Sequence, residues 1–253
     1  VAGDEFGRIF RHDIGAAGVR FDSKAVDGRS PTSRSLILVT PDGERTMNTF
    51  LGISTELDHG EVDPELIRQS GIVYLEGYLF DRPEAKAAFR QAATLARASG
   101  RRVALTLSDG FCVDRHRAEF LDLMRTGVDI LFANESEITS LYETTSFDEA
   151  ASRAAKDVPM AVLTRSAKGS VIFDKGQSVA VPVDRVGMED CANGLEVQPV
   201  HRAAPAVHRV LDHHPVGDPF HRIVVVGHVC PLGSVVGRIG RDRQRTGWRG
   251  GPA

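Results

Sequence analysis

Hydrophobic and polar positions change their spacing along the first 180 residues of the chain. Near the start, Phe6, Phe10 and Ile14 recur at helical spacing, which predicts an amphipathic helix over residues 4–17. Residues 35–50 consist of two short runs with strand character around an Asp-Gly turn. This pattern predicts a β-hairpin.

From residue 63 onwards, short apolar runs alternate with longer segments of helical spacing. The short runs predict strands at residues 72–75, 103–107, 129–132, 160–164, 170–173 and 178–181. The longer segments predict helices at residues 83–98, 115–125, 134–142 and 147–156. Repeated strand–helix units of this kind predict an α/β fold with a parallel sheet covered by helices on both faces. Ligands are then expected at the carboxyl ends of the strands.

The composition changes at about Val186. Residues 187–253 contain eight arginines and six acidic residues but no lysine, and six of the nine histidines of the chain lie there. Prolines interrupt this segment, and its one convincing strand is residues 223–226. We therefore expect two parts: residues 1–186, and an irregular tail over 187–253 that does not extend the sheet. The histidines lack the spacing of metal ligands.

Charge and cysteine content narrow the functional classes. The formal net charge is −3 and the three cysteines are scattered, so neither nucleic acid nor a membrane is expected as a partner, and a reducing, cytoplasmic setting is the simplest expectation. No apolar run is long enough to span a bilayer, and the residues after Val1 lead us to expect no signal peptide. Because the chain starts at Val1 rather than at Met, its natural start is expected upstream.

Asn134 and Glu137 directly follow a predicted strand. Three residues apart in the first helical turn, they point to the same side. A helix amino end favours phosphate, and a carboxylate holds hydrated Mg²⁺ through water. The alternative is a capping box with Asn134 as the N-cap. Both roles are compatible.

Two further segments lie at predicted strand ends. Residues 164–169 form either a backbone-lined phosphate loop or a plain hairpin turn between strands. Asp109, Arg115 and Arg117 follow another strand end, where helix capping by Asp114 is the alternative to a catalytic role.

Four motifs together resemble the ribokinase-like (PfkB-type) carbohydrate and nucleoside kinases, with the adenosine-kinase-like branch nearest. The first is Ala2-Gly-Asp-Glu-Phe-Gly7, and the second is a pair of strand ends, Tyr74–Leu79 and Leu107–Arg117. The third is Asn134-Glu-Ser-Glu137, and the fourth is Leu163–Ser170. Each motif alone is weak, but their order and spacing over residues 1–186 make the resemblance specific.

The resemblance implies ATP-dependent, Mg²⁺-assisted phosphoryl transfer to a hydroxymethyl group of a small sugar or nucleoside. The hairpin at about 35–50 is similar to the family's lid, which implies pocket residues Met47, Asn48 and Phe50, and a homodimer through the lid. Gly77 is a second implied substrate contact, and Glu137 is implied to hold Mg²⁺ through water. The implied nucleotide-binding residues are Asn134, Glu137, Thr164, Arg165, Ser166 and Gly169. Ser166 replaces the first glycine of the family's T-x-G-x-x-G pattern.

Two family signatures are absent from the sequence. The amino-terminal G-G-x-x-x-N stretch would lie upstream of Val1, and no D-T-x-G-A-G-D motif follows residues 178–181. That motif supplies the anion hole and the catalytic base, so no catalytic base is assigned, and Asp190 does not replace it. The expected fold is a ribokinase-like sheet truncated at its amino end, with impaired catalysis. The alternatives are a non-catalytic nucleotide-binding remnant and an inactive gene fragment.

Overall fold

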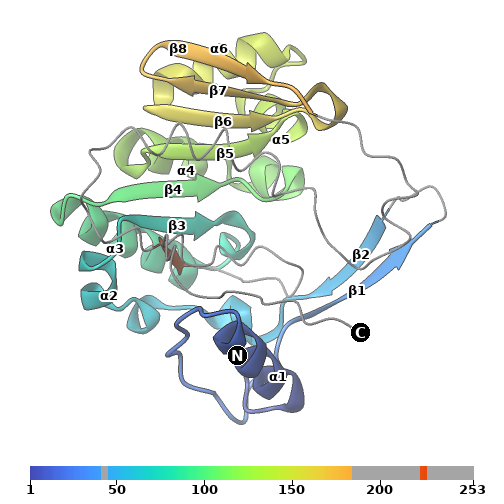
Figure 1. Cartoon of the computed structure of the whole chain (residues 1–253), viewed down its shortest axis with the longest axis vertical. Coiled ribbons are helices and arrows are strands. Elements are labelled where there is room, and N and C mark those ends of the chain that lie inside the picture. The colour runs from blue at the N-terminus through green and yellow to red at the C-terminus, as the bar shows by residue number, and fades with distance from the viewer. Residues whose placement is uncertain (41–44, 184–222, 227–253) are drawn as a thin grey trace, which may run out of the picture.

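The computed structural model describes residues 1–40, 45–183 and 223–226 (Figure 1). These residues form a seven-stranded mixed sheet with helices packed against it, and a separate two-stranded hairpin. The sheet has the strand order β8-β7-β6-β5-β4-β3-β9. Its strands are β3 (Ile72–Glu76), β4 (Arg102–Thr106), β5 (Ile130–Asn134), β6 (Met160–Thr164), β7 (Ser170–Asp174), β8 (Gln177–Val181) and β9 (Ile223–Val226).

Strands β3 to β6 are parallel and consecutive neighbours, whereas β7 and β8 run antiparallel at one edge. The crossovers between the parallel strands are helical, as parallel pairing requires. The helices are α2 (Pro64–Arg68), α3 (Pro83–Ala98), α4 (Gly110–Gly127), α5 (Glu135–Tyr142) and α6 (Phe147–Asp157). The alternation of strand and helix predicted from the sequence is confirmed.

One face of the sheet carries the main core. Alternate strand residues such as Leu75, Leu105 and Leu131 pack there against α3 to α6. Phe80, Phe89 and Phe120 are fully buried in this layer, and the rings of Phe80 and Phe120 stack with centroids 4.3 Å apart. Each such side chain contributes about 1.5–3 kcal/mol when it is removed from water.

The opposite face of the sheet is built differently. Its buried residues, including Ile72, Ala104, Ile130 and Met160, come from strands alone. The predicted α/β fold with a sheet flanked by helices is confirmed. Among residues 1–40 and 45–183, helices α3 to α6 pack on one face, and no described helix contributes to the buried cluster on the other. Alternation of strands and helices predicts crossovers, but the side of each crossover depends on handedness and on later segments.

Strand β9 corrects a second expectation. It lies parallel to β3, with Ile72 opposite Ile223 and Leu75 opposite Val226. The predicted strand at 223–226 is confirmed, but the expectation that nothing beyond Val186 extends the sheet is wrong for these four residues. The predictions for 184–222 and 227–253, including the tail histidines and Asp190, lie outside the described residues.

The hairpin consists of β1 (Arg34–Val39) and β2 (Arg45–Phe50), paired antiparallel with Leu36 opposite Asn48. It projects beyond the sheet on the side toward which the parallel strands point (Figure 1). Leu36, Leu38 and Met47 are exposed. An isolated two-stranded hairpin without a packed face has only marginal stability in water. The predicted hairpin is confirmed, and most of its apolar surface faces solvent.

The amino-terminal unit is fixed by one carboxylate. Asp4 caps α1 (Glu5–Ala16) by accepting a hydrogen bond from the Gly7 amide at 2.8 Å. The same side chain accepts from the Thr32 amide at 2.9 Å and from the Thr32 hydroxyl at 2.6 Å. These hydrogen bonds lower the pKa of Asp4, although partial desolvation opposes them.

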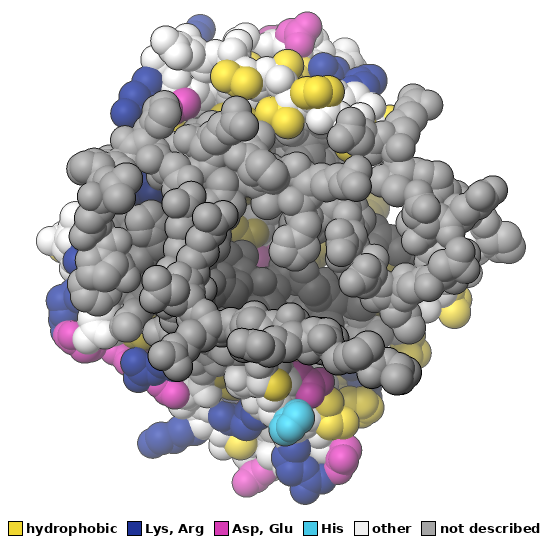
Figure 2. All heavy atoms as spheres, viewed as in Figure 1, with side chains coloured by type: hydrophobic (Ala, Val, Ile, Leu, Met, Phe, Trp, Pro, Cys, Tyr) yellow, Lys and Arg dark blue, Asp and Glu magenta, His cyan; other side chains and the backbone are white. Residues whose placement is uncertain are grey.

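Four short 3-10 turns complete the described elements: η1 (Gly52–Glu56), η2 (His59–Glu61), η3 (Gly77–Leu79) and η4 (Ser166–Lys168). On the face in Figure 2, hydrophobic side chains gather over β7 and β8. Val179 of β8 is among the exposed apolar residues. None of the described helices is both long and apolar enough to cross a membrane.

Candidate nucleotide site

Polar residues gather where the parallel strands end. Strands β5 and β6 end at Asn134 and Thr164, which are directly paired across the ladder. Strand β3 ends at Glu76, and the Ser108 hydroxyl, just beyond β4, donates to the Glu76 carboxylate at 2.8 Å. Carboxyl ends of parallel strands are where ligands bind in such sheets, so this edge is the candidate site.

The first turn of α5 is a complete capping box. The backbone amide of Glu137 donates to Asn134 Oδ1 at 2.8 Å, and the backbone amide of Asn134 donates to Glu137 Oε2 at 2.9 Å. Asn134 Nδ2 also donates to Glu137 Oε1 at 2.7 Å. The capping interpretation of these residues is confirmed, and it fixes both side chains at the helix amino end. A role toward phosphate and Mg²⁺ stays a prediction.

Glu137 is a buried carboxylate. Its exposed fraction is 6%, and desolvation raises its pKa above the ordinary 4.5. The hydrogen bond from the Asn134 backbone acts in the opposite direction, while the neighbouring Asp109 carboxylate raises the pKa further. A buried, charged Glu137 therefore costs free energy at neutral pH.

This burial predicts a pH-dependent stability. Because the pKa of Glu137 is higher in the folded than in the unfolded chain, its contribution to stability is present below about pH 4.5 and is lost as pH rises through the folded pKa. Lowering the pH from 7 to 5 should therefore stabilise the wild type relative to Glu137→Gln. Urea unfolding of both proteins at each pH measures this difference. If the difference in unfolding free energy between the two proteins did not change with pH, the raised pKa of Glu137 would be contradicted.

The loop after β6 is tightly closed. The Arg165 amide donates to the Gly169 carbonyl at 2.7 Å, and the Gly169 amide donates to the Ser166 carbonyl at 3.0 Å. Gly169 has a φ of +83°, and a Cβ there would collide with the Val181 carbonyl. Ser166, where the family pattern has glycine, has a φ of +50°. The loop thus connects antiparallel strands β6 and β7, as a hairpin turn does, and presents a fixed backbone next to α5.

An ion pair joins this loop to α5. Arg165 donates from Nη2 to Glu135 Oε1 at 3.0 Å and from Nε to Glu135 Oε2 at 3.2 Å. The guanidinium also lies 3.8 Å from the ring centroid of Phe147 in α6. Lys168 Nζ is 3.5 Å from Glu135 Oε1. Sequence reasoning missed Glu135, because its partners are about thirty residues away and only the pairing of β5 with β6 brings them together.

Asp109, Arg115 and Arg117 have different structural roles. Asp109 caps α4 by accepting from the Phe111 amide at 2.6 Å, so the suggestion that Asp114 caps this helix is wrong. Arg115 forms two hydrogen bonds of 3.0 Å with Asp81. Arg117 contacts Asp114 and the Ser140 carbonyl. The two arginines thus connect surface elements. Of the three residues, Asp109 is the one whose charge raises the pKa of Glu137.

Gly77 and Asn48, two of the implied substrate residues, differ in their surroundings. Gly77 is buried, and a Cβ there would lie 2.8 Å from the Leu107 carbonyl oxygen and 2.9 Å from that of Thr106. Its lack of a side chain is therefore required for packing at the end of β4. Asn48 lies on the exposed hairpin. Substrate contact by either residue stays a prediction.

Phe111 is a further candidate that the sequence analysis did not single out. It lies in the first turn of α4, two residues after Asp109, and 76% of it is exposed. A large aromatic side chain so exposed beside polar strand ends is unusual and offers a flat apolar surface. The sequence could have indicated Phe111, because it directly follows Ser108-Asp109-Gly110 at a predicted strand end.

The donor set near Glu137 suits hydrated Mg²⁺. Asp109 and Glu137 are two carboxylates close enough to interact, and a cation beside them would relieve their repulsion. Both oxygens of Glu137 already accept hydrogen bonds from Asn134, which favours contact through water. Among the described residues, no group of three or more His, Cys, Asp or Glu could hold a metal.

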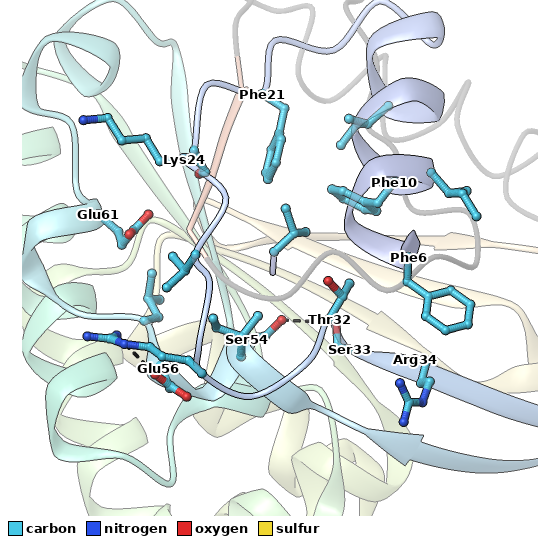
Figure 3. A pocket seen from close by; sticks show the side chains of 18 of the residues that line it. Phe6, Phe10, Phe21, Lys24, Thr32, Ser33, Arg34, Ser54, Glu56 and Glu61 are labelled. Carbon is cyan, nitrogen blue, oxygen red and sulfur yellow. Dashed lines mark hydrogen bonds and ion pairs between the residues drawn. The ribbon is translucent and has the colours of Figure 1, made fainter. Parts of the chain in front are cut away.

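A separate cavity of about 480 Å³ lies in the amino-terminal part (Figure 3). It is lined by α1, residues 21–35, η1 and nearby positions up to Glu61. The rings of Phe10 and Phe21 meet edge to face there, with centroids 5.2 Å apart. None of the implied nucleotide-binding residues is part of its lining.

Comparison with known proteins places this geometry in a family. The model of the pfkB family carbohydrate kinases matches residues 1–186. The chain belongs to this family. No curated protein matches it significantly.

Solved structures of pfkB-type kinases resemble the described fold. Adenosine kinase from Sinorhizobium meliloti is 50% identical, with a TM-score of 0.71, and the match covers 74% of this chain and 57% of that one. A probable sugar kinase from Rhizobium etli CFN 42 is 48% identical, with the same TM-score and the same coverage. A putative ribokinase II from E. coli, solved with ATP and Mg²⁺, is 18% identical with a TM-score of 0.65 over 74% of this chain and 61% of that one. It supports the fold alone. The chain thus spans less than two thirds of the length of these kinases.

Proposed function

We propose that this chain carries the nucleotide-phosphate part of an ATP-dependent, Mg²⁺-assisted kinase site. The observation that carries the proposal is the direct pairing of Asn134 with Thr164. It places the capping box of α5 beside the closed loop 164–169, so that a helix amino end and a fixed backbone loop face the same edge. Helix amino ends and closely spaced backbone amides are the usual groups that bind phosphate.

The residues divide this work. Asn134 and the first turn of α5 would face the phosphates, and Glu137 would hold Mg²⁺ through water. Thr164, Ser166 and Gly169 would line the phosphates on the other side. Bound Mg²⁺ would neutralise phosphate charge during transfer. These roles rest on position at the strand ends.

Mg·ATP binding is the direct test. If the two halves form a site, millimolar Mg·ATP should raise the melting temperature of the wild type, because a ligand that binds the folded state alone stabilises it. Glu137→Gln should reduce the dependence of this shift on Mg²⁺. Differential scanning fluorimetry with ATP, with and without Mg²⁺, provides the measurement. An unchanged melting curve of the wild type would contradict the proposal.

For the acceptor we propose a nucleoside, and a hydroxymethyl group of its sugar as the site of transfer. Phe111 supports a nucleoside acceptor, because its ring is exposed at the candidate edge and could stack on a flat base. The similarity to adenosine kinase points the same way. A small sugar is the second candidate, supported by the similarity to a probable sugar kinase.

Adenosine should therefore bind more tightly than ribose. Isothermal titration of each compound into the wild type should give measurable heat with adenosine alone. Phe111→Ala should weaken adenosine binding about tenfold, because base–aromatic stacking contributes about 1–3 kcal/mol. Phe111→Tyr, which keeps the ring, is the matched control. Equal binding of ribose and adenosine would favour a sugar acceptor.

Catalysis by this chain is expected to be impaired, because the G-A-G-D motif is missing from its sequence. A non-catalytic nucleotide-binding remnant or an inactive gene fragment is therefore the alternative. Homodimer formation through the hairpin is supported by exposed Leu36, Leu38 and Met47, and a cytoplasmic location remains the expectation from the cysteines.

A further inference from the structure

Lys168 and Arg165 of loop 164–169 both contact one carboxylate, that of Glu135 in the first turn of α5. Arg165 Nη2 and Lys168 Nζ lie 3.0 Å and 3.5 Å from the same oxygen, Glu135 Oε1. Hydrogen bonding to Arg165 and the charges of both cations lower the pKa of Glu135. Two positive side chains therefore converge on one negative group.

The two cations are held to very different degrees. Arg165 makes two hydrogen bonds to Glu135, lies on the ring of Phe147, and also feels the charge of Asp148. Lys168 has the longer contact to an oxygen that Arg165 already binds, and its side chain is 65% exposed. Arg165 is thus fixed in place, whereas Lys168 is held weakly.

The backbone limits where Lys168 can reach. Its amide donates to the Arg165 carbonyl at 3.0 Å within η4, and the loop closes through Arg165 and Gly169. Only the side chain of Lys168 can move without opening this loop. Because the loop lies beside the first turn of α5, that side chain stays near any anion bound there.

We propose that Lys168 is a phosphate-binding residue of this site and that Glu135 holds it in place before nucleotide binds. The proposal rests on the proposed nucleotide site. When a triphosphate is bound, Lys168 exchanges Glu135 for phosphate oxygens, and Arg165 stays on Glu135 as the anchor of the loop. Lysine suits this exchange because it is a mobile point charge, whereas arginine binds best in a fixed, two-pronged geometry.

The proposal assigns Glu135 two effects on nucleotide affinity. As the partner of Arg165 it positions the loop, and as the partner of Lys168 it competes with phosphate. Glu135→Gln separates them, because glutamine keeps an oxygen that can accept from Arg165 but loses the charge that attracts Lys168. Exposed ion pairs are weak, so the competition is modest.

Titration calorimetry with Mg·ATP, Mg·ADP and AMP tests this on the full chain. Lys168→Met should weaken Mg·ATP binding about tenfold, as expected for the loss of one charge-assisted phosphate contact. It should affect AMP less. Glu135→Gln should tighten Mg·ATP binding about threefold at low salt. In the Lys168→Met background, Glu135→Gln should not tighten binding.

Lys156→Met is the matched control, because Lys156 is an exposed lysine in the last turn of α6. It removes the same charge away from the loop and should leave affinity unchanged. Lys168→Arg should restore most of the binding lost in Lys168→Met. Melting curves verify that each variant is folded.

The outcomes distinguish the role of Lys168, the role of Glu135 and the nucleotide site itself. If the wild type binds Mg·ATP and Lys168→Met binds equally well, the role of Lys168 is overturned but the nucleotide site stands. If Glu135→Gln tightens binding equally in both backgrounds, Glu135 does not act through Lys168. If the folded wild type binds no nucleotide, the proposed site and this inference both fail.

Discussion

With Mg·ATP and adenosine, ribose or fructose, this chain is expected to release ADP at least about ten-thousand-fold more slowly than an ordinary kinase. The reason is the absence of the G-A-G-D motif from the sequence. Loss of a general base and loss of an anion hole each cost about a hundredfold or more in rate. A coupled assay for ADP measures the rate with each acceptor.

Two controls make this result interpretable. A pfkB-type kinase that contains the motif must turn over under the same conditions, and the heat-denatured chain gives the background. Turnover of about 1 s⁻¹, ordinary for kinases, with any of the three acceptors would show that another residue supplies the base.

Gly169→Ala is expected to destabilise the protein by about 3 kcal/mol. Two costs add at this position. The φ of +83° is unfavourable for alanine, and the new methyl group would collide with the Val181 carbonyl at the end of β8. Relief of this collision requires the loop or the edge strand to move. Urea unfolding monitored by circular dichroism measures the loss.

Gly176→Ala is the matched control for this change. Gly176 has a φ of +81°, but a Cβ there would meet nothing within 4 Å. It carries the conformational cost without the collision, so we expect a loss of about 1 kcal/mol. Equal losses for the two variants would mean that close approach to Val181 does not matter.

Local signals in the sequence predicted most elements. The alanine-rich helix at 83–98 matches α3 exactly, and the N-cap at Asn134 is where the motif placed it. Helix α4 begins earlier than predicted, at Gly110 rather than Arg115, because Asp109 and not Asp114 caps it. Such signals depend on neighbouring residues alone, so they can be interpreted without the fold.

Features that depend on long-range placement could not be predicted in this way. The Arg165–Glu135 pair requires β5 and β6 to be neighbours in a specific register. The position of helices on one face depends on the direction of each crossover, and β9 joins β3 from a distant part of the chain. The sequence indicated that residues 164–169 form a loop at a strand end, but not that Arg165 and Lys168 would contact Glu135.

The distance of β9 along the chain has a consequence for biosynthesis. Strands β3 to β7 each pair with the next strand to be made, so the block from β3 to β8 can assemble while the ribosome is still adding the rest of the chain. Among the described strands, only β9 pairs with the outer edge of β3, so within this part of the chain that edge has unpaired backbone groups until residues 223–226 emerge. An open strand edge can pair with another nascent chain. Neighbouring ribosomes on one message would bring such edges together, so slower translation of residues 184–226 is expected to lengthen the period in which the nascent protein needs chaperones.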